Sequence, residues 1–350
     1  MEPILNEIYV LSDTGTSLFS WSSDPNKREG GFELLSGFLS ALNIFAKSEK
    51  GEVMKELTLE QTTFLFQKLD QVIFVITTNE QKQKALLQLL LVDIIEAFNK
   101  EYADVIVKFD GNVGVFENFG AKLHYLLNSF MLPYINTRIA ELESNNMMQS
   151  ISVISRKSGE LLFTQAKQYV NKEDLGFLIP LLVRAGIMIS DEMPDQELGW
   201  LLIISSKDRV MLIQPRPKVY IIEEYKTSYE FPDIFKIKWK KVKEKFQNSY
   251  FLPDIGYLKI MNKNGKVLDE ISRDVDYITS IDEDSTMLLQ AGSKMVKDYY
   301  KLSLSGIVIG DDNKGTFLIP MKDFYIIIRG PQEKFKKFVT ILKFIDKIIN

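Results

Sequence analysis

The most specific match to a catalytic sequence motif is Asp13-Thr-Gly-Thr-Ser17, which lies between two apolar runs. It matches the signature of aspartic proteases, in which two carboxylates share a proton and activate a water molecule. No second Asp-Thr-Gly or Asp-Ser-Gly occurs in the sequence. A glycine after polar residues also suits a tight hairpin turn, which needs a positive φ. We therefore expect a hairpin turn here and keep an aspartic hydrolase using Asp13 as a remote alternative.

Other catalytic and metal-binding residues are scarce. The chain has no Cys and a single His, His124, which excludes thiolate chemistry and removes the usual acid–base residue. Without a second His nearby, His124 is expected to be a packed or surface residue. Asp311-Asp-Asn-Lys-Gly315 lacks the spacing and terminal Glu of an EF-hand and predicts a hairpin turn instead. Phosphate loops, dinucleotide fingerprints and nucleophile elbows are absent from the sequence. We expect no catalytic residue, no cofactor and no metal.

One basic stretch stands out in a chain whose formal net charge is −4. Apolar residues recur through it at helical spacing, from Phe235 to Phe246, which indicates a helix with a packed face and a solvated lysine face. Those lysines are candidates for contact with an acidic partner or anionic lipid. They are Lys236, Lys238, Lys240, Lys241 and Lys243.

The elements that would position these residues occur in a pattern that is found three times. Each occurrence starts with a hairpin whose turn carries a glycine, at Gly15, Gly159 and Gly265. A helix follows: the apolar stripe from Phe32 to Phe45 predicts the first, Glu173–Ile189 the second and Asp282–Tyr300 the third. The second is apolar almost all round and is expected to be sandwiched.

Short apolar strands and a closing helix end each occurrence of the pattern. The closing helices are predicted at Gln81–Lys100, Ile234–Phe246 and Gln332–Ile348. The first also has an apolar run, Val105–Val107, and a further helix at Gly120–Glu143. The sequence therefore predicts an α+β protein of three modules, at residues 1–144, 147–249 and 253–350.

This order of elements, with its hairpin glycines, resembles the longin and roadblock-like group. The group's fold is a five-stranded, mostly antiparallel sheet with helices on both faces. Module 1 is similar to a longin domain, and the third to a longin or roadblock-like domain. Three in tandem resemble the tri-longin subunits of Rab guanine nucleotide exchange factors, which act in vesicle trafficking.

The resemblance implies a non-catalytic scaffold that binds a small Ras-like GTPase. If the chain has an activity, the resemblance implies guanine nucleotide exchange, which involves no covalent chemistry. It also implies a homo- or heterodimer through the first module. The aromatic residues Phe19 and Trp21, near a sheet edge, are candidate partner contacts. A structural adaptor that binds no GTPase is the alternative. We expect a cytoplasmic protein, with peripheral membrane contact as an option and no nucleic-acid partner.

Overall fold

The computed structural model describes most of the chain and divides it into two compact units, Met1–Arg138 and Ile139–Asn350. The described residues are 5–24, 26, 30–79, 83–168, 170–191, 198–231, 240, 256–272, 282–311 and 313–331. The predicted helices at Ile234–Phe246 and Gln332–Ile348 lie outside them, apart from Lys240.

The first unit is built on a five-stranded antiparallel sheet whose strands follow the order β2-β1-β5-β4-β3. Its strands are β1 (Glu7–Ser12), β2 (Ser17–Ser22), β3 (Glu56–Thr58), β4 (Thr63–Leu69) and β5 (Val72–Thr78). Strands β1 and β5 are central and buried along their whole length. Strands β2 and β3 form the two edges of the sheet.

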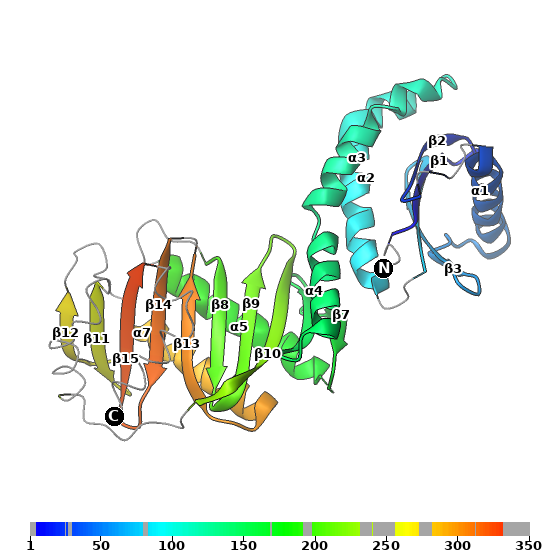
Figure 1. The fold of residues 1–350 in the computed structure, drawn as a ribbon. Coiled ribbons are helices and arrows are strands. Elements are labelled where there is room, and N and C mark those ends of the chain that lie inside the picture. Colours follow the sequence, from blue (N-terminus) through cyan, green and yellow to red (C-terminus); the bar gives the residue numbers. More distant parts are fainter. Residues whose placement is uncertain are drawn as a thin grey trace. The chain divides into compact units, whose positions relative to one another are not determined.

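Helices cover both faces of this sheet (Figure 1). They are α1 (Gly30–Lys50), α2 (Lys84–Val107), the short 3-10 turn η2 (Val113–Phe116) and α3 (Phe119–Ser129), followed by α4 (Leu132–Ser144), in which the division between the units falls. Helix α1 packs over Tyr9, Leu11 and Val75, with Leu39 buried against them. On the other face, the Phe98 ring of α2 meets the Phe74 ring of β5 edge to face, with centroids 5.5 Å apart.

Two helix boundaries in this unit differ from the prediction. The apolar run Val105–Val107 is the last turn of α2, which ends at its C-cap residue Lys108. The helix predicted at Gly120–Glu143 is broken into α3 and α4. Pro133 explains the break, because proline lacks the N–H that a continuous helix would need and disfavours helical backbone before it.

The second unit contains one ten-stranded antiparallel sheet, ordered β12-β11-β15-β14-β13-β8-β9-β10-β6-β7 (Figure 1). One half consists of β6 (Met148–Ser155), β7 (Leu161–Ala166), β8 (Trp200–Ser205), β9 (Lys207–Pro215) and β10 (Val219–Phe231). The other half consists of β11 (Tyr257–Asn262), β12 (Val267–Ser272), β13 (Leu304–Gly310), β14 (Lys314–Pro320) and β15 (Phe324–Pro331). Within each half, the strand order is that of the first unit's sheet.

The two halves meet where β8 pairs antiparallel with β13, from Leu304 opposite Ser205 to Gly310 opposite Trp200. At one end of this joint Ser206 N donates to the carbonyl of Ser303 over 2.6 Å. At the other the Trp200 ring N–H donates to the carbonyl of Asp311 over 3.2 Å. A continuous ladder therefore joins the two halves. The division into modules at 147–249 and 253–350 stays a prediction.

Two helices, α5 (Lys172–Asp191) and α7 (Asp282–Met295), lie side by side on one face of the ten-stranded sheet (Figure 1). Their buried residues share a single apolar core with residues from both halves, including Leu182, Ile203, Leu288 and Ile307. The expectation that the second helix is sandwiched is wrong for one face of α5, because Phe177 is 63% exposed there. Leu181 and Met188 are exposed as well.

The three predicted hairpin turns are confirmed. Gly15, Gly159 and Gly265 have φ values of +96°, +71° and +81° in the β1–β2, β6–β7 and β11–β12 turns. Among the helices that the structure describes, none is both long enough and apolar enough to cross a membrane.

A glycine pair tests how tightly α5 is packed. A Cβ on Gly176 of α5 would lie 2.6 Å from the Gly159 carbonyl oxygen, whereas a Cβ on Gly37 of α1 meets nothing within 4 Å. Alanine favours a helix over glycine by about 1 kcal/mol, but overpacking costs about 1–3 kcal/mol. We expect Gly176→Ala to lower the free energy of unfolding and Gly37→Ala to raise it, as urea denaturation would measure. Equal stabilisation by both would contradict the packing.

Candidate functional site

Helix α1 presents apolar side chains to solvent in the first unit. Phe38 is 52% and Phe45 62% exposed, and Ile44 is exposed beside them. The predicted apolar stripe from Phe32 to Phe45 placed Phe45 in the core, which is wrong. The described side chains of α1 that face the sheet include Leu35, Leu39, Ser36 and Ser40. Phe45 lies seven positions after Phe38, about two helical turns, so both point the same way. Helix α1 therefore has an unpartnered apolar face.

This helix lies over the β1–β2 side of the sheet, where β2 is an open edge. The predicted contact residues Phe19 and Trp21 are both on β2 and both only partly buried. Phe19 packs edge to face on Phe119 of α3, with ring centroids 5.3 Å apart. The structure therefore gives Phe19 a packing role, whereas the Phe38 and Phe45 rings of α1 are open to a partner.

The protease-like segment is a hairpin turn. Ser12 N donates to the Thr16 carbonyl over 2.9 Å and Gly15 N to the Ser12 carbonyl over 3.1 Å. The Asp13 carboxylate lies 3.8 Å from the Lys68 ammonium. A protease carboxylate instead shares a proton with a second acid, so the observed environment of Asp13 is that of a surface ion pair.

The other predicted residues lie as follows. Asp311 closes the β13–β14 turn, because its carboxylate accepts from Asn313 N and Lys314 N over 2.6 and 2.7 Å. His124 is exposed on α3. Lys240 is exposed, and the other four candidate lysines, Lys236, Lys238, Lys241 and Lys243, lie outside the described residues. Contact of this basic stretch with an acidic surface stays a prediction.

A polar cavity of about 530 Å³ lies within the second unit. Its walls come from the starts of β6, β9 and α5, from β10, and from η4 (Val296–Tyr300), a π-helical turn that directly continues α7. One lining residue is Glu224 of β10, which is 6% exposed. Glu224 lies on the core-facing side of its strand, in line with Tyr220 and Ile222. A carboxylate at such a position requires polar neighbours.

The neighbours of Glu224 are hydroxyls. Tyr299 of η4 donates to the Glu224 carboxylate over 2.7 Å. Ser150, its direct cross-strand partner on β6, and Tyr300 approach the same carboxylate, but neither hydroxyl completes a hydrogen bond of ordinary geometry. Burial raises the pKa of Glu224, while these hydroxyls and the Arg209 guanidinium oppose the shift. Burial and the nearby Glu224 charge likewise raise the pKa of Tyr299 and Tyr300.

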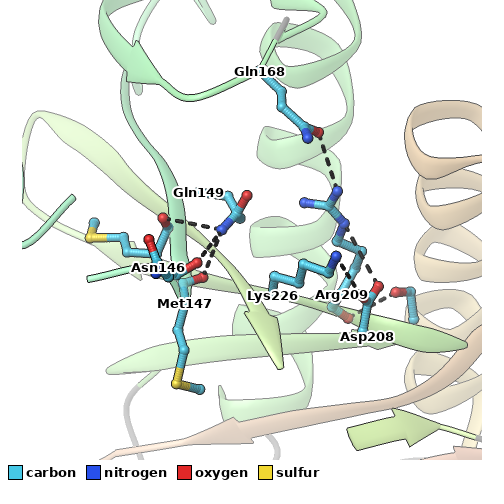
Figure 2. Close-up of polar contacts among 9 residues, drawn as sticks. Asn146, Met147, Gln149, Gln168, Asp208, Arg209 and Lys226 are labelled. Carbon is cyan, nitrogen blue, oxygen red and sulfur yellow. Dashed lines mark hydrogen bonds and ion pairs between the residues drawn. The ribbon is translucent and has the colours of Figure 1, made fainter. Parts of the chain in front are cut away.

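A charged network forms another wall of the cavity (Figure 2). Arg209 donates to the Gln168 side-chain oxygen over 3.2 Å and lies 3.9 Å from the Asp208 carboxylate. Asp208 is also 3.4 Å from the Lys226 ammonium. The Gln149 amide is held by main-chain carbonyls, with Asn146 nearest at 2.7 Å. Arg209 thus has two polar contacts beside the cavity.

Backbone irregularities gather around this cavity. The β10–β6 ladder shifts register directly after Glu224, the π-helical turn carries both tyrosines, and the next residue, Lys301, is left-handed with φ +57°. Bulges, π turns and left-handed non-glycine residues cost energy and are concentrated at functional sites. Lys301 lines the cavity, so these features favour a functional role for it.

Sequence motifs did not reveal this cavity. A signal was present, because alternation from Tyr220 and Ile222 places the next core-facing side chain at Glu224 in an otherwise apolar strand. The tyrosines of η4 come from a distant part of the chain, and no sequence motif around them indicates that they approach Glu224.

No protein-family model matches the chain, and no curated protein sequence matches it. Two solved structures are similar in part. A Roadblock/LC7 domain from Streptomyces avermitilis is 13% identical, with 29% of this chain and 88% of that domain covered and a TM-score of 0.25. The extracellular domain of a protein described as a histidine kinase, vpHK1S-Z8, is 10% identical over 73% of this chain and 97% of that one, with a TM-score of 0.17.

The raised pKa of Glu224 predicts a pH dependence of stability. Folded Glu224 holds its proton more tightly than the unfolded residue, whose pKa is 4.5. The folded state therefore binds more protons above that pH, and stability is lost as pH rises toward the folded pKa. In Glu224→Gln this loss is absent. We expect the stability of this variant relative to the parent protein to increase with pH in urea denaturation from acidic to neutral buffer; parallel pH profiles would contradict it.

Proposed function

We propose that this chain is a non-catalytic interaction scaffold of the longin and roadblock-like group that binds a small Ras-like GTPase. The structure supports a mixed fold of helices and antiparallel sheets. Three sets of five strands follow one order, which favours three modules, two of them joined in one sheet. Each module would then be a copy of one sheet-and-helix unit. The proposal extends the sequence resemblance.

The observation that carries the proposal is the exposed apolar face of α1. Phe38, Ile44 and Phe45 are large apolar side chains left in water on one helix, and such surfaces mark interaction sites. The open edge of β2 lies beside this helix and could extend a partner's sheet. We infer that this surface, α1 with the β2 edge, binds the GTPase or a dimer partner.

Two binding modes fit this surface. In the first, residues 1–144 of two chains, identical or different, pair and present a composite surface to the GTPase. In the second, the surface contacts the GTPase directly and shifts its nucleotide-binding loops. In either mode, exchange would proceed through shape and differential binding, with no covalent step.

The direct experiment measures the release of a fluorescent guanine nucleotide from a panel of small GTPases, with and without the purified chain. Light scattering of the same samples measures the molecular mass of the chain and of any complex that it forms. Faster release from one GTPase would support an exchange factor and name its substrate. Binding without faster release would indicate an effector or a subunit that needs a partner. No binding to any panel member would favour the structural adaptor.

Substitutions on α1 locate the surface. We expect the double variant Phe38→Asp and Phe45→Asp to weaken GTPase binding or dimerisation by about 2 kcal/mol or more, roughly thirtyfold. The variant removes two apolar rings from the binding surface and places two charges there. Binding titrations and sedimentation would measure the loss.

The matched control is Tyr125→Asp, an exposed aromatic residue on α3, which covers the other face of the sheet. It should leave binding unchanged. Equal losses from the control and the α1 variant would place the surface elsewhere. Since all three side chains are exposed, the variants should keep the fold, which circular dichroism can check.

A further inference from the structure

We propose that the cavity around Glu224 binds a small organic molecule through a primary ammonium group. The cavity lies wholly in the second unit, so this inference does not rest on the proposed GTPase surface on α1.

The walls carry more negative than positive charge. Four carboxylates line the cavity, those of Asp174, Asp208, Glu224 and Asp298, against the two cations Arg209 and Lys301. Asp208 already lies beside Arg209 and Lys226. The ion pairs between described residues do not include Glu224 or Asp174. The cavity therefore favours a cation.

Buried hydroxyls specify the kind of cation. The Ser150 side chain is 2% exposed, and neither its hydroxyl nor that of Tyr300 completes a hydrogen bond of ordinary geometry. Both approach the Glu224 carboxylate. A buried hydroxyl without a partner is costly, and an ammonium group offers three N–H donors. Glu224, Ser150 and Tyr300 together supply three acceptors for them.

A metal ion fits less well than an ammonium group. Among the residues that the structure describes, no group of three His, Cys, Asp or Glu side chains is close enough to hold one. Hydroxyls of Ser and Tyr together with one carboxylate are instead the acceptors that an organic ammonium uses.

The rest of the ligand has room and a second contact. About 530 Å³ is far more than one ammonium group fills. Arg209, which contacts Gln168 and Asp208 (Figure 2), also lines this cavity. A ligand carboxylate would suit it. The shared chemistry is the ammonium, which a free amino acid or a simple amine could supply.

The screening experiment measures thermal unfolding of the full chain with each free amino acid in turn, with ethanolamine and with putrescine. At least one probe should raise the unfolding temperature, and calorimetry should then give one site per chain. Binding of amino acids alone would assign the ligand carboxylate to Arg209. Binding of the amines as well would assign recognition to the ammonium alone. If no probe shifts the unfolding temperature, the proposal is wrong.

Paired variants identify the acceptor. Glu224→Gln should weaken binding of the active probe at least about tenfold, because a charge-assisted hydrogen bond is lost. Glu223→Gln, the same change on the other face of the strand, where Glu223 accepts from Tyr225, should leave binding unchanged. Unchanged affinity in Glu224→Gln would overturn the proposal.

Two further readouts keep the test decisive if Glu224→Gln does not fold. Tyr300→Phe removes one acceptor and should weaken binding without removing a charge. In the parent protein, binding should release a proton and strengthen as pH rises, because the ammonium pairs with the ionised carboxylate. Calorimetry in two buffers of different ionisation enthalpy measures that proton. Absence of both effects would count against Glu224 as the acceptor.

Discussion

The pairing of β8 with β13 is the constraint on which the second unit depends. It joins two five-strand sets into one sheet, so that no edge strand is exposed where they meet. It also places α5 and α7 on one face, where they share one core. Because α7 and its π-helical end extend over strands of the other half, the joint brings Tyr299 and Tyr300 to Glu224. The cavity is thus a product of the joint.

The first unit has a single sheet with different packing on its two faces. Its sheet stands alone, with an aromatic cluster around Phe98 on one face and α1 on the other. Helix α1 packs Leu35, Leu39 and two serines toward the sheet and leaves Phe38 and Phe45 exposed to water. In a helix whose sequence has apolar residues on more than one side, only one side can meet the sheet. The remainder is available to another molecule.

Strain in the second unit is concentrated where its polar residues are buried. The register shift after Glu224, the π turn and the left-handed Lys301 all border the same cavity. The surrounding core must stabilise this arrangement against its cost. Irregular backbone with such a cost is typical of a site with a role beyond packing.

The sequence by itself determined local elements: the glycine hairpins, the helices that follow them and the turn at Asp13. These depend on periodicity and on φ, which neighbouring residues fix. Only the tertiary structure decided which helix face is buried, so that Phe45 and Phe177 are exposed. It also decided that β8 pairs with β13 and that Tyr299 meets Glu224, 75 residues away in the chain. Contacts at such separation depend on the packing of whole layers, for which a single sequence carries no local signal.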